Sequence, residues 1–479
     1  MGIDVSGGSG GTSVGLEDLL AAAASLHSAG GELGEALARV VAGVVASDLA
    51  QSHPLSPATA AWAETAIARA TGPTGLVSDV AALEGLAELT RGAVAAYRAS
   101  EATVTAGLQT AREGLMVLVG QQVAGLVVAS MVLEAKGVDV AAVTDRALFE
   151  APQVADLGGS TAGLALGLAT NPLTAPLLRP GLAGRDDADR GLDGGPAGPD
   201  ELGLRVLADS AGAWGLLDDS GRAVVEPEPA PGPGARAPVD LASLARDQAR
   251  LSDAEDYPGR VRVVEVPQER GSAWLVEISG TQVWDPRAGE SAHDVTTDVR
   301  LMAQESTVLA DGVQQALAEA QAASGRDTTA EPVLLAGHSL GGMVAAGLAS
   351  SPAFRTRHGR VSVVTMGSPV SRMPVPAEVS VLALQHTQDV VPRLDGRADP
   401  DRRSWVTVTR DLRGDADVSR TVRGAHDSRE YVQTAQEADR SVDPSLRDWR
   451  ESHQQFFEPA PGREPTIRDY RIERLKDGP

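Results

Sequence analysis

The sequence contains no cysteine, which excludes disulfide bonds, thiolate nucleophiles and cysteine-ligated metal sites. This absence leaves the compartment open, because proteins without disulfides occur inside and outside cells. Lysine is almost absent as well, since Lys136 and Lys476 are the two examples. The 65 acidic residues outnumber the 42 basic ones, and the net charge of −23 argues against nucleic acid as a partner, because phosphate binding needs a basic surface.

Aromatic side chains make up 3% of the chain, whereas hydrophobic residues make up 42%, so the cores must be built from Ala, Leu and Val. The first twelve residues are rich in Gly and Ser and are expected to be flexible. They lack a basic region followed by an apolar one, so we expect no signal peptide. This predicts a cytoplasmic protein, or one exported by a signal-peptide-independent route, with or without membrane association.

Residues 1–150 are predicted to form a helical bundle that serves membrane contact, export or partner binding. Apolar residues recur every three or four positions over 16–44 and again over 83–108, which is the helix period, with a break expected at residues 30–31. The uncharged segment 114–133, from Gly114 to Leu133, is twenty residues long, enough for a helix to cross a bilayer. Two interpretations stay open for it: membrane contact, or a central helix buried in an Ala-rich bundle.

Residues 151–238 are predicted to be a Gly- and Pro-rich connector. Within it, the uncharged stretch 157–178 carries prolines that favour a loose loop or a partner contact. Apolar residues on both sides of the polar turn 218–221 predict a hairpin within 204–225.

From residue 239 to residue 479 strand and helix patterns alternate, which indicates an α/β sheet with helices on its faces. Two β-rich runs separated by a polar turn, 261–266 and 273–279, should pair as a hairpin. A long helix is expected over 294–323. Further strands are expected at 332–336, 361–366, 379–384 and 405–409.

The sequence Gly337-His338-Ser339-Leu340-Gly341 follows an apolar strand and precedes small helix-forming residues. This context is typical of the G-x-S-x-G nucleophile elbow. The turn holds the serine in a strained conformation, and side chains at the two glycines would collide with the neighbouring strand and helix. We therefore predict Ser339 as a nucleophile, with the backbone N–H of Leu340 at the helix start donating to the oxyanion.

A serine needs a general base at neutral pH, and in α/β hydrolases the acid and then the histidine follow the serine along the chain. Four histidines come after Ser339. His358 comes too early, His386 precedes the best acid, and His453 lies in a polar helix expected at the surface. His426, in a loop before the helix predicted at 429–438, is the predicted base.

Asp389 is the predicted acid because it follows directly on the strand expected at 379–384. Catalytic residues of parallel sheets gather in loops at the carboxyl ends of the strands. Asp395 is the alternative. Asp427 is excluded because it cannot easily reach the far ring nitrogen of the histidine beside it.

The C-terminal part of the chain resembles the class 3 (fungal-type) lipases of the α/β-hydrolase superfamily. The resemblance rests on four short segments that precede His426 in the order of the family's blocks: Ile278-Ser279-Gly280-Thr281, residues 337–342, Thr365-Met366-Gly367-Ser368-Pro369 and residues 389–394. It implies that the backbone N–H of Thr281 supplies the second oxyanion-hole donor. It also places the family's lid at 284–296, where Trp284 is the main apolar residue, so interfacial activation is not expected.

These features predict a serine ester hydrolase with a Ser-His-Asp triad. The leading interpretation is a lipase or phospholipase that acts on lipid esters. A carboxylesterase or thioesterase for small soluble substrates is the second interpretation. The third is a helical secretion or interaction protein with a hydrolase-fold scaffold, since Tyr97 and Glu101 resemble an element of type VII secretion substrates. The predicted chemistry requires no metal and no cofactor, and the sequence identifies no protein partner.

Overall fold

The computed structural model describes residues 2–46, 53–72, 75–135, 139–172, 174–182, 190–229, 235–253, 259–415 and 417–476. Within these ranges, the side chains of residues 43–46, 123–135, 140 and 157–159 lie outside the description. The chain divides into two compact units, which are described separately: Thr12–Leu108, and Met1–Gly11 together with Gln109–Pro479.

The first unit is helical, as predicted, and contains α1 (Thr12–Ala46), α3 (Pro57–Thr71) and the first half of α4 (Leu76–Ala135). The break expected at residues 30–31 is wrong, because α1 runs through both glycines. Glycine in a helix costs only about 1 kcal/mol, so the pair need not end a long helix. A Cβ on Gly30 would lie 3.0 Å from Glu84 of α4, which also hydrogen-bonds His27 at 2.7 Å.

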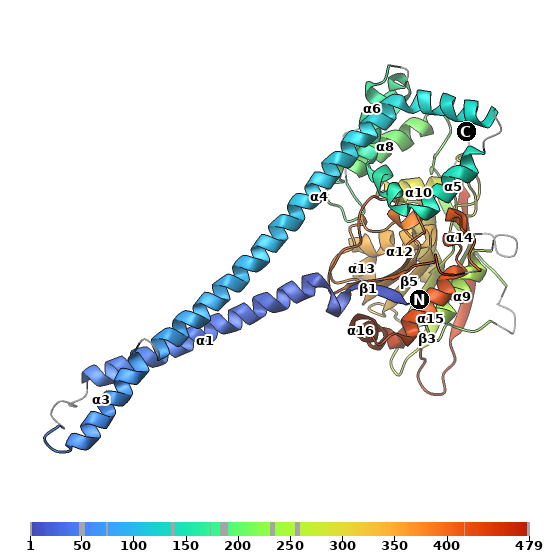
Figure 1. Cartoon of the computed structure of the whole chain (residues 1–479). Coiled ribbons are helices and arrows are strands. Elements are labelled where there is room, and N and C mark those ends of the chain that lie inside the picture. Colours follow the sequence, from blue (N-terminus) through green and yellow to red (C-terminus); the bar gives the residue numbers. More distant parts are fainter. Residues whose placement is uncertain are drawn as a thin grey trace. The chain divides into compact units, whose positions relative to one another are not determined.

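Residues 114–133 lie within α4 (Figure 1). In the part of the chain that the structure describes, no helix is both long and apolar enough to cross a membrane. The side chains of 123–133 lie outside the described set, so membrane contact through this segment stays a prediction.

A nine-stranded sheet forms the centre of the second unit, in the order β1-β8-β7-β6-β5-β4-β3-β9-β2. The neighbours from β4 to β8 are parallel, and all pairs outside them are antiparallel. The strand bounds are β1 (Ile3–Gly7), β2 (Arg222–Pro227), β3 (Arg260–Pro267), β4 (Ser272–Ile278), β5 (Val333–His338), β6 (Val361–Met366), β7 (Ser380–His386), β8 (Trp405–Arg410) and β9 (Thr466–Leu475).

Helices cover both faces of this sheet, which confirms the predicted α/β architecture (Figure 1). Alternate residues of each parallel strand enter different cores, as the two-residue period of a strand requires. On β5, for example, Leu335 joins one core and Leu334 the other. The first core takes its helical residues from α10 (Val295–Met302), α11 (Val308–Ala323), α12 (Leu340–Ser350) and α13 (Pro352–Arg357), and the second from α9 (Leu241–Leu251), α15 (Glu430–Arg440) and α16 (Pro444–His453).

The hairpin predicted at 261–279 is confirmed, since β3 and β4 are antiparallel with Val263 opposite Val276. The single helix expected over 294–323 is wrong, because the chain turns between α10 and α11. Gln304 lies in that turn with φ of 56°, a conformation that an α-helix cannot contain.

The expectation of a flexible N-terminus is also wrong. β1 forms an edge of the sheet and pairs with β8. It ends at Gly7, where a Cβ would lie 2.1 Å from the carbonyl oxygen of Trp405, so the chain can pass there only as glycine. The partner strand lies about 400 residues later in the sequence, and no local pattern reports such a pairing.

The segment 157–178, expected to be a loose loop or a partner contact, contains helix α6 (Thr161–Thr170). Its Gly163 and Gly167 allow close approach to α4, because a Cβ on either would lie 2.6 Å or less from an α4 carbonyl oxygen. The same unit contains α5 (Val140–Glu150), α7 (Arg179–Leu182) and the short 3₁₀ helices η2 (Pro152–Gly159), η3 (Ala175–Leu178) and η4 (Val391–Arg393).

The hairpin predicted within 204–225 does not form. Its first half belongs to helix α8 (Pro199–Gly212), and its second half is β2, which pairs with the C-terminal strand β9. The remaining short helices of this unit are η1 (Gly8–Gly10), α14 (Val422–Ala425) and η5 (Gln454–Phe456).

Candidate active site

The elbow around Ser339 has the geometry that its sequence predicts. β5 ends at His338, α12 begins at Leu340, and the serine between them has φ 54° and ψ −120°. A Cβ on Gly337 would lie 2.1 Å from the backbone of Gly341, and one on Gly341 would lie 2.0 Å from the carbonyl oxygen of Ile278. The two glycines therefore let the turn fit between β4 and α12, and the strained backbone presents the serine side chain at the end of the sheet.

The structure brings the three predicted triad residues together. His426 Nε2 lies 3.0 Å from Ser339 Oγ, and His426 Nδ1 lies 2.7 Å from Asp389 Oδ2. The serine is 7% exposed and the aspartate is fully buried. Ser339 directly follows β5, and Asp389 lies in the loop after β7. Both are at the carboxyl ends of parallel strands, where such sheets collect reactive groups.

Asp389 is held by more than the histidine. Its Oδ2 also accepts a hydrogen bond of 2.7 Å from the hydroxyl of Tyr431, and its Oδ1 accepts one of 2.9 Å from the N–H of Val391. Burial acts to raise the pKa of this carboxyl, but the electrostatic interaction with the facing His426 and these hydrogen bonds outweigh burial and lower the pKa below its usual value. The carboxylate is therefore ionised near neutral pH.

The loop that carries His426, called the histidine loop below, is supported by two further histidines from the strands of the sheet. His338 Nε2 donates to the carbonyl of His426 at 2.9 Å, and His386 Nδ1 donates to the carbonyl of Ala425 at 2.8 Å. Burial lowers the pKa of His338 to about 3 and that of His386 to about 4, so both rings are neutral at pH 7. Neither ring therefore repels the positive charge that His426 gains when it takes up a proton.

The two predicted oxyanion donors come from different elements, Leu340 from the start of α12 and Thr281 from the loop after β4. Leu340 is the first residue of α12, so its N–H is one of the groups that a helix start leaves without an intrahelical partner. Gly280 borders the serine, since a Cβ on it would lie 3.5 Å from Ser339 Cβ, and Thr281 follows directly. Thr281 Oγ1 donates to Asp298 Oδ2 at 2.8 Å. Burial raises the pKa of Asp298 to about 7.

The rejected candidates His386 and Asp395 bind groups other than Ser339 and His426 Nδ1. Both ring nitrogens of His386 are occupied, by the Ala425 carbonyl and by Thr434 Oγ1. Asp395 accepts from the backbone N–H groups of Ser371 and Arg397.

The predicted surface position of His453 is wrong, because its side chain is fully buried and stacks on Trp449 at 4.3 Å. The face of α16 that carries it packs against the sheet, where Ser362 of β6 hydrogen-bonds the ring. Polar composition alone does not identify this face.

Sequence reasoning missed Tyr431, Asp298 and the supporting role of His338 and His386. Tyr431 lies five residues after His426 in α15, and a search for an aromatic hydroxyl near the histidine could have proposed it. Asp298 lies seventeen residues after Thr281, and no sequence signal joins the two.

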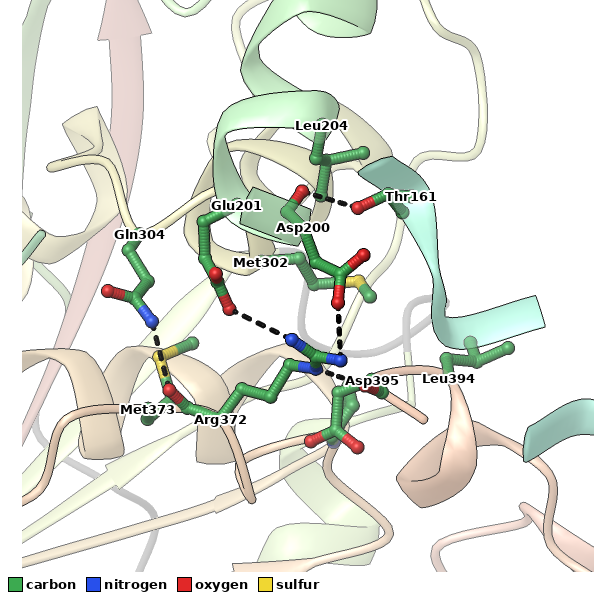
Figure 2. A pocket seen from close by; sticks show the side chains of 11 residues that line it. Thr161, Asp200, Glu201, Leu204, Met302, Gln304, Arg372, Met373, Leu394 and Asp395 are labelled. Atoms are coloured by element: carbon green, nitrogen blue, oxygen red, sulfur yellow. Dashed lines mark hydrogen bonds and ion pairs between the residues drawn. The ribbon is translucent and has the colours of Figure 1, made fainter. Parts of the chain in front are cut away.

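A small cavity of about 20 Å³ lies beside these loops, between α8 and the loop after β6 (Figure 2). Arg372 crosses it to reach Asp200 at 2.6 Å and Glu201 at 3.6 Å, and its Nε donates to the carbonyl of Asp395 at 2.5 Å. The space fits about one water molecule. Ser339 does not line it, so we assign it a structural role in joining α8 to the loop region. Within the described ranges, no group of three acidic, histidine or cysteine side chains could hold a metal ion.

Comparison with known families gives one match. The model of the PGAP1-like alpha/beta domain, a family with the hydrolase fold, matches residues 292–423. This segment contains Ser339 and Asp389 and ends three residues before His426. Comparison with curated proteins and with solved structures gives no match. The chain therefore carries an α/β hydrolase-like domain together with a helical N-terminal region, and the match supports a hydrolase type of activity. The likeness to class 3 lipases stays a prediction.

Proposed function

We propose that the chain is a serine hydrolase of carboxylic esters, with Ser339 as nucleophile, His426 as general base and Asp389 as the orienting acid. The observation that carries this proposal is the line of two hydrogen bonds from Ser339 Oγ through the His426 ring to Asp389 Oδ2, at 3.0 and 2.7 Å. A hydrogen-bonded nucleophile and base, with the base oriented by a third group, is the arrangement that activates a serine.

The proposed reaction has two halves. Ser339 Oγ attacks the ester carbonyl while its proton moves to His426, and the ionised Asp389 stabilises the imidazolium. The N–H groups of Leu340 and Thr281 stabilise the oxyanion, and His426 returns the proton to the leaving alcohol. Water then attacks the acyl-enzyme with His426 again as base, which releases the acid and restores the serine.

The substrate class is proposed as lipid esters, in line with the resemblance to class 3 lipases, and a small-substrate carboxylesterase or thioesterase is the alternative. Hydrolysis of a p-nitrophenyl ester series from short to long acyl chains tests both. We expect the parent protein to cleave at least one member, and Ser339→Ala to lose about 10⁴-fold or more in kcat. An optimum at long chains favours the lipase, and one at short chains favours the alternative.

Glu269→Gln, a change in the β3–β4 turn, serves as the control variant and should keep full activity. Equal inactivity of the folded parent and Ser339→Ala across the series, in water and with lipid vesicles, would contradict the proposal. The hydrolase fold would then act as a scaffold for the helical region.

A further inference from the structure

The loop that carries His426 is contacted by a helix from outside the matched hydrolase segment. Asp145 Oδ1, on α5, accepts a hydrogen bond of 3.0 Å from the N–H of Val422, the first residue of α14. One turn further along α5, Phe149 is 1% exposed. Its ring belongs to a small buried cluster whose other members all precede the histidine: Leu412, Val418 and Ala425. Ala425 is the residue directly before His426.

These contacts are the principal anchors of α5. Most described residues of the helix are exposed, including Val143 at 61%, and Phe149 is the one described side chain of α5 that is buried. A helix kept mainly to stabilise a core would bury a continuous stripe. The burial of α5 is instead concentrated at the histidine loop, as its position beside α14 illustrates (Figure 1).

The loop that carries Asp389 is held by the same part of the chain. Arg393, four residues after the aspartate, pairs with both carboxylate oxygens of Asp156 in η2 at 3.2 Å. Arg112, in the last half of α4, donates to the carbonyl of Gly396 at 2.5 Å. One continuous stretch, from Arg112 to Asp156, therefore contacts both the acid loop and the base loop.

The histidine loop is thus held from two sides. On the side of the sheet, His338 and His386 bind the carbonyl oxygens of His426 and Ala425. From α5, Asp145 accepts a hydrogen bond from an N–H at the start of α14, and Phe149 shares a buried cluster with Ala425. α14 has only four residues, too few to be stable alone, so its place depends on these contacts.

We propose that four residues outside the matched segment position the two loops: Arg112 and Asp156 hold the loop of Asp389, and Asp145 and Phe149 are positioning residues for His426. This inference rests on the proposed function, because it assigns a role in orienting the proposed base. The helical part of the chain would then act on the reaction through the position of His426: an imidazole displaced by about 1 Å from the serine can lose about 100-fold in rate.

The test uses full-length variants. Asp145→Ala removes the acceptor and Phe149→Ala removes the ring, whereas Asp145→Asn and Phe149→Leu restore an acceptor and an apolar side chain. Val143→Ala, on the exposed face of the same helix, is the matched control. The measurements are kcat and KM on the best p-nitrophenyl ester, the rate of reaction with a fluorophosphonate, and the pH dependence of both. Circular dichroism verifies the fold.

We expect the two alanine variants to lose about 10- to 100-fold in kcat with KM within about twofold, because the base is misplaced while the substrate site remains. Asp145→Asn and Phe149→Leu should recover most of the loss, and Val143→Ala should match the parent. Folded alanine variants whose kcat stays within about twofold of the parent would overturn the inference. If Phe149→Ala does not fold, the pair Asp145→Ala and Asp145→Asn decides.

Amide hydrogen exchange separates this inference from the proposed function. Faster exchange at residues 422–426 in Asp145→Ala than in the parent is expected whether or not the parent hydrolyses esters. If the parent is inactive but Asp145→Ala shows the faster exchange, the ester hydrolase is contradicted and the positioning contact is supported. Unchanged exchange at 422–426 overturns the positioning contact itself.

Discussion

Asp389 Oδ2 accepts two hydrogen bonds, one from His426 and one from Tyr431, each 2.7 Å long. Tyr431 is itself buried and stacks on His386 at 3.8 Å with an angle of 19° between the rings. The acid is therefore fixed through an aromatic pair that also contacts the histidine loop. Such a group acts on the reaction only through the orientation of another residue.

Replacing Tyr431 by phenylalanine tests this support. A hydrogen bond to a charged group is worth about 1.5–3 kcal/mol, so Tyr431→Phe should lower kcat by about 10- to 100-fold while KM stays near the parent value. The loss of this bond should also raise the pKa of Asp389, because the bond stabilises the ionised form. The exposed Gln433 of the same helix provides the control Gln433→Ala. A kcat for Tyr431→Phe within about twofold of the parent would show that the other two hydrogen bonds suffice.

Thr281 is the proposed second oxyanion donor, and it follows Gly280, which borders Ser339. The hydroxyl donates to Asp298, and this bond fixes the residue. We expect Thr281→Val to lower kcat by about 10-fold or more and Thr281→Ser to keep most of it. Steady-state kinetics of the two variants with one ester provides the comparison. Equal activity of the Val and Ser variants would limit the role of Thr281 to its backbone.

At the scale of elements, α16 contributes a buried histidine whose protonation opposes folding. His453 donates from Nδ1 to the Trp449 carbonyl at 2.7 Å and accepts from Ser362 at 3.0 Å, and burial lowers its pKa from 6.5 to about 4. Above pH 6.5 the ring is neutral in the folded and the unfolded chain. As pH falls below 6.5 the unfolded chain takes up a proton that the folded chain does not, and stability is lost until about pH 4.

The loss assigned to His453 between pH 7 and pH 5 is about 2 kcal/mol, because one pKa unit corresponds to 1.36 kcal/mol. His453→Gln should remove this part of the pH dependence, measured as the difference in urea-unfolding free energy between the two pH values. Phe456→Leu, at a neighbouring buried ring, should lower stability equally at both pH values. Parallel pH profiles for the parent and His453→Gln would disprove the assignment.

Elements predicted well from the sequence are those whose signal is local. The elbow, the β3–β4 hairpin and the parallel strands each have the turn chemistry or period that defines them within about ten residues. β1 and β2 escaped prediction because their partners, β8 and β9, lie hundreds of residues away. The prolines of 157–178 led to the prediction of a loose loop or a partner contact, whereas the glycines of the same stretch permit helix α6 to contact α4.

The residues of the candidate site also fall into two groups, those with a local sequence signal and those without one. Motif order and spacing along the chain were enough to propose Ser339, Asp389 and His426, which the structure brings within hydrogen-bond reach of one another. Tyr431, Asp298 and the α5 contacts depend on the packing of separate elements, and neither motif order nor helix period reports them.

At the scale of the whole molecule, a net charge of −23 and an uncharged segment at 114–133 act in opposite directions at a lipid surface. Apolar side chains favour insertion, while the acidic chain is repelled by anionic headgroups. The described start of the segment exposes Leu115 at 39% and Leu118 at 58%. We therefore expect the full-length protein to bind neutral vesicles more strongly than anionic ones, a difference that should shrink as salt is raised.

Vesicle flotation measures this binding. With phosphatidylcholine vesicles, the double variant Leu115→Gln, Leu118→Gln should reduce the bound fraction by about 10-fold or more, because each leucine that leaves water contributes about 1.5–3 kcal/mol. The matched control is Leu86→Gln, Leu89→Gln, which changes two leucines of the same helix that are 52% and 73% exposed. If both double variants float like the parent, binding does not depend on these side chains. If the parent itself stays in the soluble fraction with every vesicle composition, the segment does not contact lipid, and the interpretation of 114–133 as a helix packed within the protein is favoured.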